Sequence, residues 1–102
     1  MKAAGPSDQW ILVGADDDSL TFRLRPGAVK TFGRAPRADF IVNRALVSRL
    51  HCRLTASDQI LAVEDLSSTN GTFVNGKRIK RAELKSGDRL KIGRIELTVE
   101  RA

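Results

Sequence analysis

The chain has 102 residues, which is enough for one domain with a single core but not for two. Hydrophobic residues make up 41% and charged residues 29%, which argues against disorder, and no apolar run approaches the roughly 20 residues that a membrane-spanning helix needs. A single cysteine excludes an internal disulfide and the N-terminal segment lacks the apolar core of a secretory signal, so we expect an intracellular, cytoplasmic protein.

Short apolar segments follow one another along the chain, with polar turns between them. Several alternate apolar and polar residues, a period of two that is typical of half-buried strands. We expect strands in the segments 10–14, 20–24, 29–33, 40–42, 51–56, 60–66, 72–74, 77–79, 89–93 and 95–100. No segment keeps a helical period of about 3.6 residues, and 81–87 allows at most one helical turn. The pattern predicts an all-β sandwich or barrel.

Asn-Gly pairs occur twice in close succession, at 70–71 and at 75–76. The second pair predicts a hairpin between 72–74 and 77–79, because both residues accept the positive φ of a type I′ turn. The first pair ends a Ser-Ser-Thr run, whose hydroxyls form a compact set of hydrogen-bonding groups with the Asn70 amide. This loop could hold a polar ligand, or it could be only a well-satisfied turn.

The net charge of +6 is concentrated in residues 23–53, which hold eight basic residues and one acid, Asp39. Seven of the eight are arginine, whose planar guanidinium suits phosphate or carboxylate and favours an anionic partner. A solvated basic face would explain the same charge. Only 5% of the residues are aromatic, so few side chains could stack on bases, which argues against nucleic acid as the partner.

Two enzyme-like patterns lack the context that their chemistry needs. Segment 71–78 matches the beginning of a phosphate-binding P-loop, but Arg78 stands where Ser or Thr belongs and no helix is indicated after it. Ser48, His51 and Asp65 could form a nominal hydrolase triad, but nothing indicates a strained elbow or oxyanion donors. One His and one Cys cannot supply the four ligands of a structural zinc site. We therefore expect no enzyme activity, metal or cofactor. We expect His51 to be a buried side chain that hydrogen-bonds the neighbouring backbone.

Four motifs, in this order, carry a resemblance to a known family: FGR at 32–34, SRLHC at 48–52, LSSTNGTFVNG at 66–76 and LKSGDRLKIG at 84–93. Together they resemble the forkhead-associated (FHA) domain, a phosphothreonine-binding module. The resemblance implies a β-sandwich of about eleven mostly antiparallel strands that binds phosphopeptide through loops at one end. It also implies an FHA-like domain over residues 10–102 and an N-terminal extension over residues 1–9.

The resemblance implies roles for individual residues of the binding loops. Arg34 and Ser48 would bind the phosphate, and Thr69 would bind either the phosphate or the loop that holds it. Asn70 would hydrogen-bond the peptide backbone beside the modified residue. Arg49 is counted among the phosphopeptide-binding residues. It would add a second cation to the site, and the alternative is that its side chain points to solvent.

Three further positions would shape the loops without touching ligand. Gly33 and His51 would shape the loops, and Gly71 would close the turn after Asn70. The first Asn-Gly pair would then present binding groups, and the second would only close a hairpin.

Two departures from the family pattern leave the preference for flanking peptide residues open. Arg49 stands where some relatives use Asn, and Leu46 offers no charge where some relatives place a base. Arg37, Arg44 and Arg49 could favour acidic residues beside the phosphothreonine.

The resemblance implies a non-enzymatic module for phosphothreonine-dependent protein–protein recognition. Its partner would be a phosphothreonine-containing protein or peptide that a kinase has modified, with no role for a membrane or for nucleic acid. The alternative is a phosphorylation-independent FHA-fold scaffold that holds protein through a sheet face or through its basic loops.

Overall fold

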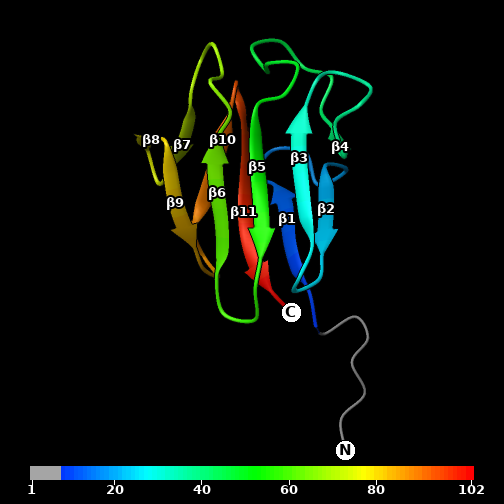
Figure 1. The fold of residues 1–102 in the computed structure, drawn as a ribbon, viewed down its shortest axis with the longest axis vertical. Coiled ribbons are helices and arrows are strands. Elements are labelled where there is room, and N and C mark those ends of the chain that lie inside the picture. Colours follow the sequence, from blue (N-terminus) through cyan, green and yellow to red (C-terminus); the bar gives the residue numbers. More distant parts are fainter. Residues whose placement is uncertain (1–7) are drawn as a thin grey trace, which may run out of the picture.

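The computed structural model describes residues 8–102, which form eleven β-strands and no helix. The strands make two sheets that lie face to face, so the all-β sandwich expected from the sequence is confirmed (Figure 1). None of the described residues belongs to a helix that could cross a membrane.

One sheet has six strands, all paired antiparallel with their neighbours. Their order across the sheet is β2 (Thr21–Leu24), β1 (Trp10–Gly14), β11 (Ile95–Arg101), β10 (Arg89–Ile92), β7 (Thr72–Val74) and β8 (Lys77–Ile79). Strands β7 and β8 form the predicted hairpin, and Asn75 and Gly76 at its turn both have positive φ, 50° and 85°.

The other sheet has five strands and contains the parallel pair of the structure, β3 with β4. Its order is β4 (Phe40–Ile41), β3 (Val29–Gly33), β5 (Cys52–Ala56), β6 (Leu61–Asp65) and β9 (Arg81–Leu84). The helical turn allowed for 81–87 is wrong, because residues 81–84 pair with β6 as an edge strand. Backbone pairing with β6 overrides the weak local preference of this short segment.

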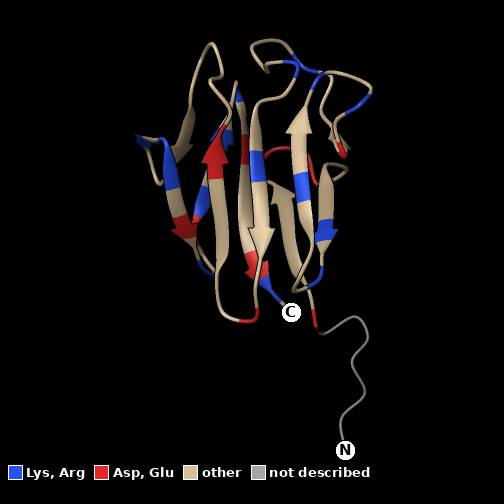
Figure 2. Cartoon of the chain, viewed as in Figure 1, with Lys and Arg blue, Asp and Glu red and all other residues tan. Residues whose placement is uncertain are grey.

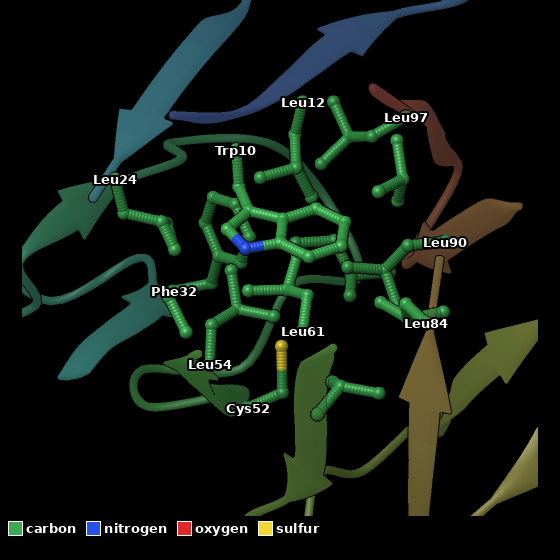
Figure 3. Close-up of a cluster of buried hydrophobic side chains, with 14 of the residues drawn as sticks. Trp10, Leu12, Leu24, Phe32, Cys52, Leu54, Leu61, Leu84, Leu90 and Leu97 are labelled. Carbon is green, nitrogen blue, oxygen red and sulfur yellow. The ribbon is translucent and has the colours of Figure 1, made fainter. Parts of the chain in front are cut away.

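The core lies between the two sheets and is built from alternate residues along the strands, those whose side chains face inward. In β5 the burial alternates along the strand, and Cys52, Leu54 and Ala56 are buried. Trp10 lies in the middle of a cluster of leucine side chains (Figure 3), and its Nε1 donates a hydrogen bond to the Ser57 carbonyl at 2.8 Å. The core therefore ties the first strand to the β5–β6 turn.

The loops that follow β3, β4 and β6 gather at one end of the sandwich, opposite the end at which the chain finishes (Figure 1). At that opposite end β1 pairs with β11, the Ala102 N–H donates to the Gln9 carbonyl, and Arg101 forms an ion pair with Asp8. Residues 1–7 of the expected N-terminal extension lie outside the described residues, and the domain boundary at residue 10 stays a prediction.

Candidate functional site

Arg34 follows β3 directly and is held at the loop end of the sandwich by two hydrogen bonds. Its N–H donates to the Ser48 carbonyl at 2.9 Å, and its Nε donates to the Val47 carbonyl at 3.0 Å. The side chain is exposed, and its two terminal nitrogens make no hydrogen bond to any residue between 8 and 102. The guanidinium is therefore held through Nε, and the N–H groups of its two terminal nitrogens are available to a ligand.

Ser48 and Thr69, which are 21 residues apart, join the β4–β5 loop to the β6–β7 loop. The Thr69 N–H donates to the Ser48 Oγ at 3.0 Å. Because a hydroxyl also carries one proton of its own, Ser48 Oγ can still donate to a ligand. The Thr69 residue is exposed beside it.

Asn70 crosses to the same loop, where its Nδ2 donates to the Leu46 carbonyl at 3.1 Å. Its amide oxygen and second amide proton stay available for a ligand, because the side chain has four hydrogen-bonding positions. Leu46 has a φ of +71°, in the left-handed region that side chains other than glycine seldom adopt. The carbonyl of this residue, whose backbone conformation is unfavourable, is the one that positions the Asn70 amide.

His51 is fully buried and links the two binding loops from beneath. The Ser48 N–H donates to its Nδ1 at 3.0 Å, and its Nε2 lies 2.8 Å from the Gly71 carbonyl. A backbone N–H can only donate and a carbonyl can only accept, so the ring is the neutral tautomer with its proton on Nε2. Both ring nitrogens are thus engaged by backbone groups.

This arrangement leaves no hydrolytic triad among Ser48, His51 and Asp65. His51 contacts the backbone N–H of Ser48 rather than its hydroxyl, and the hydroxyl binds Thr69. The Asp65 carboxylate bonds Ser68 and Thr72 instead of the imidazole. A triad needs an imidazole nitrogen within reach of the nucleophilic oxygen, and here that nitrogen is occupied.

Two glycines lie at positions of the site where a side chain does not fit, Gly33 against backbone and Gly71 in a left-handed conformation beside a side chain. A Cβ on Gly33 would lie 2.0 Å from the Arg49 carbonyl oxygen, so any side chain would force the loops apart. Gly71 has a φ of +92°, and a Cβ there would lie 2.7 Å from Nε of Arg78. A side chain at either position would therefore disturb the loops of the site.

Asp65 organises the loop that carries Thr69 and Asn70, a role that the sequence analysis missed. Its carboxylate accepts hydrogen bonds from the Ser68 N–H at 3.2 Å, the Ser68 hydroxyl at 2.5 Å and the Thr72 hydroxyl at 2.7 Å. Partial burial acts to raise its pKa, but these hydrogen bonds outweigh burial and hold the pKa below its usual value. The available signal was an Asp followed by a run of Ser and Thr, because these side chains readily hydrogen-bond nearby backbone groups in turns.

The six residues that line the resulting hollow come from three loops. The hollow measures about 270 Å³ and is lined by Arg34, Leu46, Val47, Ser48, Thr69 and Asn70. Four of the five residues expected to bind phosphopeptide thus lie together. Arg49 lies outside this hollow and lines a neighbouring one.

The remaining sequence patterns do not create sites in residues 8–102. The P-loop-like segment 71–78 is the β7–β8 hairpin, so no helix N-terminus faces a phosphate there. Within the described part of the chain, no group of three or more His, Cys, Asp or Glu side chains could hold a metal ion.

Comparison with known proteins agrees with this geometry. The family model described as FHA domain matches residues 30–93. The ABC transporter ATP-binding/permease protein Rv1747 of Mycobacterium tuberculosis is 44% identical over 78 residues, 76% of this chain but 9% of that protein. The FHA domain-containing protein FhaA of the same organism is 34% identical over 84 residues, which cover 82% of this chain and 16% of FhaA.

Solved structures share the fold over nearly the whole chain. One, from a structural and functional analysis of phosphothreonine-dependent FHA domain interactions, has a TM-score of 0.82 and 33% identity, and the match covers 90% of this chain and 95% of that one.

Proposed function

This chain belongs to the FHA domain family, and from that premise we propose that it is a phosphothreonine-dependent recognition module that docks a protein partner modified by a kinase. FHA domains are interaction modules, and the proposal needs neither catalysis nor a cofactor. The solved relative from the study of phosphothreonine-dependent FHA interactions supports the same ligand class. The chain spans only a small part of the two curated relatives named above, so the proposal concerns the domain alone.

The observation that carries the proposal is the hollow bounded by Arg34, Ser48 and Asn70. A phosphothreonine brings a charge of about −1.5 to −2 and three acceptor oxygens. The hollow offers donors of matching chemistry: free guanidinium nitrogens, a hydroxyl proton and an amide. Hydrogen bonds to charged groups contribute roughly 1.5–3 kcal/mol each, so a few of them support micromolar affinity, about −8 kcal/mol, after the entropy of association is subtracted.

Each residue of the site has a distinct proposed role. Arg34 and Ser48 bind the phosphate, and Thr69 holds the loop through its N–H on Ser48. Asn70 binds the peptide backbone beside the modified threonine, with its amide held in place by the Leu46 carbonyl.

Replacing Arg34 by Ala tests the proposal directly. We expect the variant to fold normally, because the residue is exposed, and to lose at least about 30-fold in affinity, since truncating such a charge contact costs about 2–5 kcal/mol. Peptides would be selected from a degenerate phosphothreonine library and titrated by calorimetry. Arg23→Ala is the matched control, because Arg23 is an exposed arginine on β2, outside the hollow.

Two outcomes would contradict the proposal in different ways. Equal affinity of wild-type protein for phosphorylated and unphosphorylated peptides would favour the scaffold alternative. Unchanged affinity in Arg34→Ala would show that the phosphate binds elsewhere. A gel shift with DNA at two salt concentrations would reveal nucleic-acid binding, which should fall steeply as salt rises.

A further inference from the structure

A second hollow adjoins the one lined by Arg34, Ser48, Thr69 and Asn70, which we call the phosphate hollow after its proposed ligand, and Arg34 lines both. It measures about 260 Å³ and is lined by Arg34, Ala35, Pro36 and Arg49. In the phosphate hollow, Arg34 is accompanied by Ser48 and Asn70. Arg34 thus lines both spaces, and a ligand in one would lie next to a ligand in the other.

The backbone fixes the position of Arg49 at this second hollow. Its carbonyl accepts a hydrogen bond from the Ala35 N–H at 3.0 Å and lies against Gly33, where a Cβ would approach it to 2.0 Å. The Arg49 side chain itself is exposed, and it forms no ion pair or hydrogen bond with another residue of 8–102. Arg49 therefore presents an uncompensated cation from a fixed anchor.

The other arginines named as candidates for peptide flanks differ from Arg49. Arg44 is paired with Asp17, with an Nη2 to Oδ2 distance of 3.3 Å. Arg37 is exposed in the loop after β3 but lines neither hollow. The structure thus separates three arginines that the sequence could not distinguish.

No acid lines either hollow. Asp39, which is the acid of the basic segment, lines neither hollow, and its carboxylate accepts hydrogen bonds from the Thr31 N–H at 2.9 Å and the Thr31 hydroxyl at 3.1 Å. Figure 2 shows basic residues along the loops at this end of the sandwich. The positive charge of Arg34 and Arg49 is therefore not offset by an acid in either lining, and an anion in the second hollow would lie beside both arginines.

We propose that the second hollow binds a second anionic side chain of the same peptide, close in sequence to the phosphothreonine. This inference rests on the proposed function. Nε of Arg34 is used by the Val47 carbonyl, so its two terminal nitrogens are the donors available to the two anions. Because an extended peptide advances about 3.3 Å per residue and the hollows adjoin, the second anion lies within about four residues of the phosphothreonine.

The ligand chemistry is a carboxylate or a second phosphate, and a peptide series distinguishes the two. Phosphothreonine peptides would carry Glu, Gln or phosphoserine at one position at a time, from four residues before to four residues after the phosphothreonine. Dissociation constants would be measured for wild type, Arg49→Gln and Arg37→Gln. The two variants make the same charge change in neighbouring loops.

We expect wild type to bind the Glu peptide at least fivefold more tightly than the Gln peptide at one or two positions. This ratio should fall to near one in Arg49→Gln and persist in Arg37→Gln. A larger gain with phosphoserine than with Glu would identify a second phosphate as the preferred group, and the reverse would identify a carboxylate.

Three results would overturn the inference: no preference for Glu or phosphoserine at any position, a preference that persists in Arg49→Gln, or a preference that Arg37→Gln abolishes equally. Each would leave phosphothreonine binding itself intact. Failure of the proposed function is a different result, in which neither the Gln peptide nor the Glu peptide binds more tightly than its unphosphorylated form.

Discussion

At the scale of single residues, the buried side chain of His51 connects the two loops of the candidate site. It links Ser48 in one loop to Gly71 in the other through both ring nitrogens. Its own backbone also bridges strands, because its N–H donates to the Phe32 carbonyl and its carbonyl accepts from the Leu66 N–H. The distance between the two loops, and so the shape of the phosphate hollow, depends on this residue.

We expect His51→Phe to lower the free energy of unfolding by about 2–4 kcal/mol. Phe fills similar space but leaves the Ser48 N–H and the Gly71 carbonyl without partners, and each unsatisfied buried group costs about 1–3 kcal/mol. Urea denaturation of both proteins measures the effect. His51→Ala should cost more, because it adds a cavity. A Phe variant as stable as wild type would show that packing alone accounts for the residue.

At the scale of elements, the β6–β7 loop is a self-contained unit built on a carboxylate at the end of β6. Asp65 accepts hydrogen bonds from Ser68 and Thr72, and the Ser68 hydroxyl accepts one from the Gly71 N–H at 3.0 Å. The loop therefore holds its shape through its own bonds and offers Thr69 and Asn70 at its tip. We infer that Asp65 positions the ligand-binding groups.

The lowered pKa of Asp65 predicts how stability depends on pH. A carboxyl whose folded pKa lies below the unfolded value of 3.8 contributes stability above that value, and this contribution is lost as pH falls through the folded pKa. We expect Asp65→Asn to be less stable than wild type at pH 7 and the gap to narrow below about pH 4. Thermal melts of both proteins at several pH values measure this difference in stability. Parallel pH curves for the two proteins would contradict the assignment.

At the scale of the whole molecule, the charge is unevenly distributed, because the net charge of +6 is concentrated in residues 23–53. Arg34 and Arg49 lie at the loop end of the sandwich, and the chain finishes at the other end (Figure 1). We therefore expect a phosphopeptide that approaches the loops to be attracted before it makes contact.

We expect the association rate of a phosphothreonine peptide to fall as salt rises, with a smaller change in the dissociation rate. The Debye length shrinks from about 30 Å at 0.01 M to about 10 Å at 0.1 M salt, which screens long-range attraction more than contacts in the hollow. Stopped-flow measurements over this range test it. A double variant, Arg23→Gln with Arg25→Gln, lowers the net charge without altering the hollow and should slow association only. An association rate that does not depend on salt would rule out steering.

The sequence by itself was sufficient to predict ten of the eleven strands and the second Asn-Gly turn. Alternation and turn chemistry are properties of neighbouring residues, so segments such as 95–100 and the pair at 75–76 could be interpreted locally. The same local reasoning failed at 81–84, where a weak segment becomes a strand only because β6 lies beside it.

Only the tertiary structure decided which polar residues meet. Ser48 and Thr69 are 21 residues apart and Asp17 and Arg44 are 27 apart, so these contacts follow from the register and packing of the two sheets. The resemblance supplied the candidate residues of the site, but not the placement of Arg49 at a neighbouring hollow or the loop built on Asp65. Local sequence sets backbone preferences, whereas the distances between loops are set by the core that joins the strands beneath them.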